Sequence, residues 1–154
     1  MFDTIKKSAA LKGIIMDKYA SGGCLCGDVR YICFSKPIMS GLCHCRDCQK
    51  NTGSAHAPIL IFAKDKVEVS GDSAKTFEHE GDSGKTVKRS FCMNCGSSFM
   101  AEYEVTPNFR VIMGGTLDDP SLIKPEWNIY TSSKQPWIEL SPHMKSFEGG
   151  FKKE

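Results

Sequence analysis

Alternation of apolar and polar residues predicts β-strands along most of the chain after Gly22. Residues 28–34 and 66–70 alternate in this way, as expected for a strand with one buried face. Residues 58–63 form a short, continuously apolar run. The signals along this part of the chain are therefore mostly those of strands and turns.

Two pairs of these stretches are separated by turn residues and predict β-hairpins. Residues 74–80 and 85–91 flank the glycine-rich turn at 81–84, and residues 97–103 and 109–113 flank a Thr-Pro-Asn turn. No repeat and no linker divides the sequence. We predict a mainly β fold of small antiparallel sheets with one or two short helices.

A chain of 154 residues is long enough for one domain with its own core. Residues 1–19 contain no cysteine and show a weak helical pattern, so we interpret them as an N-terminal extension that is either helical or disordered. We expect the domain to occupy residues 20–148 and a short tail to follow at 149–154.

Composition places the chain among globular proteins, with 40% hydrophobic and 25% charged residues. Because it has neither a run that could span a bilayer nor a signal peptide, we expect a cytoplasmic protein without membrane contact. The formal charge of +2 does not indicate nucleic-acid binding, because the basic residues are scattered. If the clustered cysteines bind zinc as thiolates, the net charge of the protein with its metal ions also becomes negative.

Eight cysteines carry the strongest chemical signal. All but Cys33 fall into three clusters: Cys24 with Cys26; Cys43, Cys45 and Cys48; and Cys92 with Cys95. Four disulfides are one interpretation, but C-x-C and C-x-x-C spacings in a chain of this length suit metal binding better. Cys33 alternates with apolar residues and is predicted to fill the core.

The clusters divide most naturally into a group of four and a group of three, since zinc prefers four tetrahedral ligands. Cys92 and Cys95 precede Gly96, as in a zinc knuckle, and need two partners from elsewhere. Cys24 and Cys26, among flexible glycines, can supply them. A zinc ion with four cysteine ligands is closed and therefore structural.

The central cluster keeps Cys43, Cys45 and Cys48 for a second metal ion. Residues 46–52 predict a short helix that ends at Gly53, and a helix N-terminus favours the thiolate form of cysteine. Three protein ligands leave one position open for water or a substrate thiol, which is typical of a catalytic zinc. A single zinc ribbon built from Cys45-x-x-Cys48 and Cys92-x-x-Cys95 is the alternative.

Several motifs, taken in order along the chain, add a resemblance to a known family. They are Gly23-Cys24-Leu25-Cys26-Gly27, Cys43-His44-Cys45-x-x-Cys48 with Thr52-Gly53-Ser54, Phe91-Cys92-x-x-Cys95-Gly96, Gly115-Thr116-Leu117-Asp118-Asp119-Pro120 and Pro136-Trp137. Together they resemble the glutathione-dependent formaldehyde-activating enzyme family, whose domain also occurs in centromere protein V.

The resemblance implies a mainly β fold built around two zinc ions. It assigns the structural zinc to the cysteines at positions 24, 26, 92 and 95, and the catalytic zinc to those at 43, 45 and 48. The activity named for the family joins glutathione to formaldehyde and is classed with carbon–sulfur lyases. Zinc is thus the expected cofactor, and a small thiol such as a glutathione adduct is the expected substrate.

Two histidine positions bear on the chemistry. Family members often carry a histidine after the Asp-Asp-Pro turn, where this chain has Trp127-Asn128-Ile129, and Asn128 cannot act as a base. His44 could shuttle protons near neutral pH or point away from the metal; the flanking ligands favour the second.

Three functions are consistent with these residues. The first is a zinc-dependent carbon–sulfur lyase acting on a glutathione adduct or another small thiol. The second is a non-enzymatic zinc module that binds a protein partner, with its second metal closed by a fourth ligand. The third is redox sensing by the crowded thiols.

Overall fold

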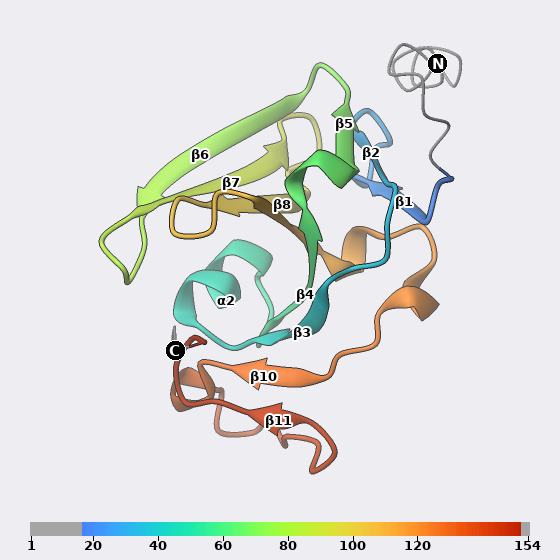
Figure 1. Ribbon diagram of the computed structural model, residues 1–154. Coiled ribbons are helices and arrows are strands. Elements are labelled where there is room, and N and C mark those ends of the chain that lie inside the picture. The colour runs from blue at the N-terminus through green and yellow to red at the C-terminus, as the bar shows by residue number, and fades with distance from the viewer. Residues whose placement is uncertain (1–16, 152–154) are drawn as a thin grey trace.

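The computed structural model describes residues 17–151, which form two β-sheets and a short α-helix (Figure 1). The predicted helical pattern near the N-terminus lies outside the described residues, apart from its last three positions. The strands are β1 (Ala20–Gly23), β2 (Arg30–Cys33), β3 (Met39–Cys43), β4 (Ala57–Ala63), β5 (Val67–Ser70), β6 (Ala74–Glu80), β7 (Thr86–Cys92), β8 (Ser98–Tyr103), β9 (Phe109–Met113), β10 (Trp127–Ile129) and β11 (Lys145–Ser146).

The helix α2 (Arg46–Thr52) lies inside the curve of the larger sheet (Figure 1). Short 3₁₀ turns complete the chain: η1 (Lys64–Lys66), η2 (Gly114–Thr116), η3 (Pro120–Leu122) and η4 (Thr131–Ser133). The mainly β prediction is confirmed. No helix between residues 17 and 151 combines the length and hydrophobicity needed to cross a membrane.

The smaller sheet has the strand order β1-β2-β5, and the larger has the order β11-β10-β3-β4-β9-β8-β7-β6. Both predicted hairpins are present, because β6 pairs with β7 and β8 pairs with β9, each antiparallel. The sequence did not predict that β10 joins the larger sheet parallel to β3. Parallel neighbours need a long connection, and this one carries no local turn signal.

Two clusters of buried side chains form the core. The first contains Tyr31, Phe62 and Phe99, each at most 1% exposed, and also contains Cys33, as predicted. The second surrounds Ile59 and Trp127. Cys24 and Cys92 belong to the first cluster, whereas Cys43 and Cys48 belong to the second. Each group of cysteines is therefore anchored by one part of the core.

The close approach of β10 to β3 depends on a glycine. Gly41 of β3 pairs with Trp127 of β10, and a Cβ atom at Gly41 would lie only 2.2 Å from the Trp127 ring. The same register places Ile129 beside Cys43. Packing at Gly41 therefore sets the position of the segment that follows β10, including Tyr130.

We predict that Gly41→Ala destabilises the protein by about 1–3 kcal/mol, because the added methyl group overpacks against Trp127. The measurement is the midpoint of thermal unfolding. Gly115→Ala is the matched control, since a Cβ there meets no atom within 4 Å. Equal midpoints for the two variants would contradict this account of β10 docking.

Candidate metal centres

Four cysteines from two distant turns converge beside the first core cluster. Cys24 and Cys26 lie between β1 and β2, while Cys92 ends β7 and Cys95 precedes β8. All four sulfur atoms lie within 4.8 Å of one another, with 3.5 Å between Cys24 and Cys26 and 3.8 Å between Cys26 and Cys92. A tetrahedral zinc–thiolate site requires sulfur separations of about 3.8 Å. The group has the size and ligand number for one such ion.

Both turns have the geometry of a metal-binding knuckle. The N–H of Gly27 donates to the carbonyl of Cys24, and the N–H of Gly96 donates to that of Cys92. Both glycines have the left-handed backbone, with φ of 81° and 74°. This conformation strains residues that carry a Cβ, so glycine after each pair of cysteines lets the chain turn back towards the sulfurs.

Hydrogen bonds to sulfur stabilise each knuckle, and one further hydrogen bond joins the two knuckles. The N–H of Val29 donates to Cys24 Sγ at 3.2 Å. The hydroxyl of Ser97 lies 3.3 Å from Cys95 Sγ and accepts a hydrogen bond from the N–H of Leu25. Hydrogen bonding to Ser97 lowers the pKa of Cys95 to about 5, which favours its thiolate. Part of the negative charge of the group therefore lies on Cys95.

The second group contains Cys43, Cys45 and Cys48, whose sulfurs also lie within 4.8 Å of one another. Cys43 ends β3, and Cys45 is the N-cap of α2, with its sulfur accepting a hydrogen bond from the N–H of Cys48 at 3.3 Å. Gly53 ends the helix with a left-handed cap, as predicted. Among residues 17–151, no further His, Cys, Asp or Glu joins this group.

The three thiols polarise one another. Hydrogen bonds from Cys43 and Cys48 lower the pKa of Cys45 to about 2, and the backbone N–H of Cys48 adds to this effect. The same contacts raise the pKa of Cys43. Negative charge therefore concentrates on Cys45, the half-buried sulfur of the three.

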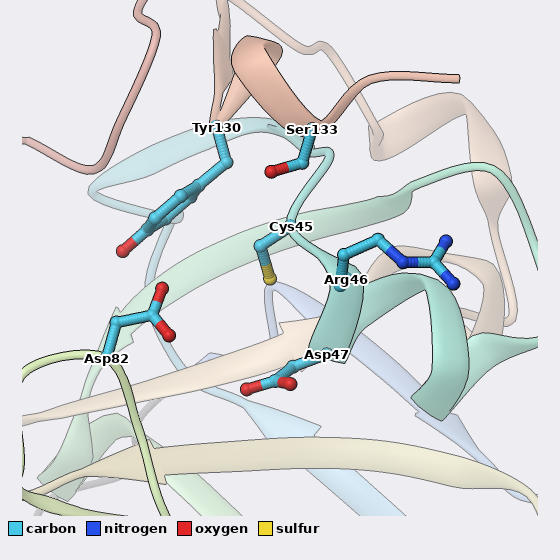
Figure 2. Close-up of a pocket in the computed structure, with 6 residues that line it drawn as sticks. All are labelled: Cys45, Arg46, Asp47, Asp82, Tyr130 and Ser133. Carbon is cyan, nitrogen blue, oxygen red and sulfur yellow. The ribbon is translucent and has the colours of Figure 1, made fainter.

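Cys45 opens onto a pocket of about 230 Å³ (Figure 2). Its walls come from α2, from the β6–β7 turn and from the segment after β10, and its lining residues are Cys45, Arg46, Asp47, Asp82, Tyr130 and Ser133. Figure 2 shows the Cys45 sulfur directed into the space between Tyr130, Asp82 and Asp47. The guanidinium group of Arg46 turns away from that space and donates to Gln49.

Tyr130 combines a special backbone with a position over this pocket. Its φ of 56° makes it the non-glycine residue with positive φ in the part of the chain that the structure describes. Its N–H donates to the carbonyl of Gly149, and a Cβ at Gly150 would lie 2.8 Å from its hydroxyl oxygen. The C-terminal segment therefore holds the ring in place. Left-handed tyrosine is costly, and such strain often marks functional sites.

His44 lies between two of these cysteines in sequence, but its ring has other partners. The side chain is fully buried, and its Nε2 lies 3.0 Å from Oδ1 of Asn128. Asn128 in turn donates to the hydroxyl of Ser146 at 3.3 Å. Asn128 thus anchors His44 to β10, and the histidine ring does not join the sulfur group.

The two sulfur groups are separate, and all eight cysteines are free. Cys45 and Cys48 do not meet Cys92 and Cys95, so the alternative of a single zinc ribbon is wrong. Sequence reasoning missed Tyr130 and Ser133, which follow β10 without any motif. It assigned Asp82 only to a hairpin turn.

Comparison with known proteins identifies a family for this chain. Residues 19–133 match the family described as glutathione-dependent formaldehyde-activating enzyme. The chain belongs to this family. A search of curated proteins found no match. A crystal structure of a Rhodobacter sphaeroides protein is similar in fold, with 19% sequence identity and a TM-score of 0.52 over 66% of this chain and 92% of that chain.

Family membership confirms the resemblance recognised from the motifs. Together with the two sulfur groups, it is consistent with zinc as the metal and with a substrate related to glutathione. Thiolates are favourable zinc ligands, so the donor set fits this ion.

We predict two zinc ions per chain, with an average of about 3.5 sulfur ligands each, in protein purified without chelator. Metal analysis combined with X-ray absorption spectroscopy measures both quantities. Cys33→Ala serves as the control, because Cys33 lies in the core outside both groups and its loss leaves the zinc content unchanged. A single zinc ion with four sulfur ligands, even after zinc is added back, would contradict the prediction.

Proposed function

We propose that this protein is a zinc-dependent enzyme of the carbon–sulfur lyase type that acts on a glutathione adduct or another small thiol. The observation that carries the proposal is a group of three cysteines whose half-buried member faces a pocket. A catalytic zinc typically has three protein ligands and one position for water or substrate.

In this proposal, Cys43, Cys45 and Cys48 hold the catalytic zinc, and the group of Cys24, Cys26, Cys92 and Cys95 holds a structural one. Bound zinc supplies a Lewis acid that favours the thiolate form of a substrate thiol. The N-cap position of Cys45 and the burial of Cys43 and Cys48 keep the three ligands in place. These residues therefore act by orienting the metal towards the pocket.

The reaction proposed by analogy with the family joins the sulfur of glutathione to the carbon of formaldehyde. A carbon–sulfur bond forms, the carbonyl π bond breaks, and the thiol proton ends on the former carbonyl oxygen. The reverse reaction breaks the same carbon–sulfur bond. Charge develops on the oxygen, so a hydrogen-bond donor in the pocket accelerates both directions.

Tyr130 is the candidate for that donor. Its hydroxyl lies over the pocket, and burial raises its pKa, with further contributions from Asp82 and the three thiols. The phenol therefore stays protonated at neutral pH and can donate to a substrate oxygen. The hydroxyl of Ser133 lines the same pocket.

Asp47 and Asp82 give the pocket a negative rim. Carboxylates in such a position attract a cationic group, and glutathione carries one α-ammonium. We assign these two residues to substrate orientation, since neither lies in the sulfur group.

One observation favours the second function, a zinc module that binds a protein partner. The pocket volume of about 230 Å³ is below the roughly 300–1,000 Å³ typical of small-molecule sites. In that case a side chain from the partner closes the three-cysteine site. Formaldehyde and a thiol are small, however, so the pocket does not exclude the enzyme.

We predict that Cys92→Ala lowers the unfolding midpoint much more than Cys43→Ala. Loss of the four-cysteine metal disconnects the β1–β2 turn from β7, whereas Cys43 serves a site whose metal does not link the two sheets. Thermal unfolding and zinc content are measured for both variants. Equal destabilisation would remove the main support for an open, catalytic site.

We predict that Tyr130→Phe lowers catalysed exchange between glutathione and S-(hydroxymethyl)glutathione by about 100-fold, as for loss of one transition-state hydrogen bond. Exchange NMR at equilibrium measures this rate above the uncatalysed background. Tyr19→Phe is the control, because Tyr19 packs against the first core cluster. No difference between the variants would contradict the role of Tyr130. No acceleration by the wild-type protein would contradict the proposed substrate.

A further inference from the structure

Arg89 of β7 is a buried cation beside the three-cysteine group. Its side chain is only 8% exposed, and it projects from β7 of the larger sheet towards Asp47 of α2. Burial of an ionised group is costly unless an opposite charge compensates it. The structure must therefore supply negative charge close to this guanidinium group.

Two of the three guanidinium nitrogens of Arg89 have polar partners. Nε donates to Nε2 of His79 at 3.0 Å, and Nη2 lies 4.0 Å from the carboxylate of Asp47. His79 is a neutral acceptor in this bond, and its Nδ1 lies 3.0 Å from the carbonyl of Glu80. Asp47 is half-exposed and at the limit of an ion pair, so it compensates the charge only weakly.

The third nitrogen, Nη1, is buried without a hydrogen-bond partner. The thiols of Cys48 and Cys45 interact favourably with the Arg89 cation as well. Burial lowers the pKa of Arg89, but Tyr103, Cys48 and Cys45 raise it, and the net shift is upward. Reciprocally, Arg89 contributes to the low pKa of Cys45. Cation and sulfur group therefore stabilise each other.

We propose that Arg89 is the fixed countercharge of the three-cysteine metal site and thereby lets it accept an anionic fourth ligand, a substrate thiolate. Three thiolates and one zinc ion carry one net negative charge, which opposes the approach of a further anion. The guanidinium charge offsets it. Arg89 does not touch the substrate; it acts through the ligands as a positioning residue. This inference rests on the proposed function.

The test uses full-length protein loaded with Co²⁺, whose visible spectrum changes when a ligand enters the open position. The probes are 2-mercaptoethanol, which binds as a thiolate, and imidazole, which binds as a neutral molecule, both at one fixed pH. We expect Arg89→Met to weaken thiolate binding roughly tenfold while changing imidazole binding less than about twofold, because only the anion interacts with the lost charge.

Two further variants separate charge from structure. Arg89→Lys keeps the charge, so we expect its preference for thiolate over imidazole to stay within about threefold of wild type. Lys88→Met removes a cation from the neighbouring position, where Lys88 forms an exposed ion pair with Glu78 at 2.9 Å, and we expect no change. If Arg89→Met does not fold, the Arg89→Lys result alone tests the inference.

The outcomes distinguish the inference from the proposed function. Equal losses of thiolate and imidazole binding in Arg89→Met, or a loss of thiolate preference in Arg89→Lys, would overturn the role of Arg89 and leave an open site intact. Failure of the wild-type protein to bind either probe would instead overturn the open site, and the inference with it.

Discussion

The convergence of four cysteine sulfurs is the constraint on which the rest of the structure depends. It joins the turn between β1 and β2, in the smaller sheet, to the turn between β7 and β8, in the larger one. Cys24 and Cys92 also belong to the first core cluster, so the sulfur group and the apolar core support the same arrangement. Binding of a structural zinc contributes on the order of 10 kcal/mol in small domains. Each knuckle is a short hydrogen-bonded turn, so metal binding at the two knuckles would also stabilise the packing of the two sheets.

The three-cysteine group is held differently, because helix capping and one sheet position its ligands. Cys45 caps α2, Cys48 lies in its first turn, and Cys43 ends the strand that precedes the helix. Asn51 of α2 donates to the hydroxyl of Ser98 at 2.8 Å, which fixes the helix to β8. Local structure thus brings the three sulfurs together, and the sulfur of Cys45 faces the pocket.

Features that depend on residues close together in the sequence were predicted, whereas features that depend on distant residues were not. The strands near 28–34, 58–63 and 66–70, the two hairpins, and the helix at 46–52 with its glycine cap depend on neighbouring residues and were predicted, whereas β1 and β3 were not. Spacing alone suggested the two groups of cysteines, because metal ligands leave a short-range signature. The parallel docking of β10, and with it Tyr130, depends on the contact between Gly41 and Trp127 from distant parts of the chain. The role of Arg89 was likewise not recognisable from the sequence, because only burial distinguishes it from the exposed Lys88 beside it.

Electrostatic balance connects these features to function. With zinc bound as proposed, the four-cysteine site would carry two negative charges and would have no position for ligand exchange. With zinc bound as proposed, the three-cysteine site would carry one negative charge, for which Arg89 is the proposed fixed countercharge. When a substrate thiolate binds, the summed charge of the zinc, its ligands and Arg89 would be −1, whereas it would be −2 without Arg89. Under the proposed function, a site balanced in this way would bind thiolate and also release it, which a reversible reaction at a carbon–sulfur bond requires.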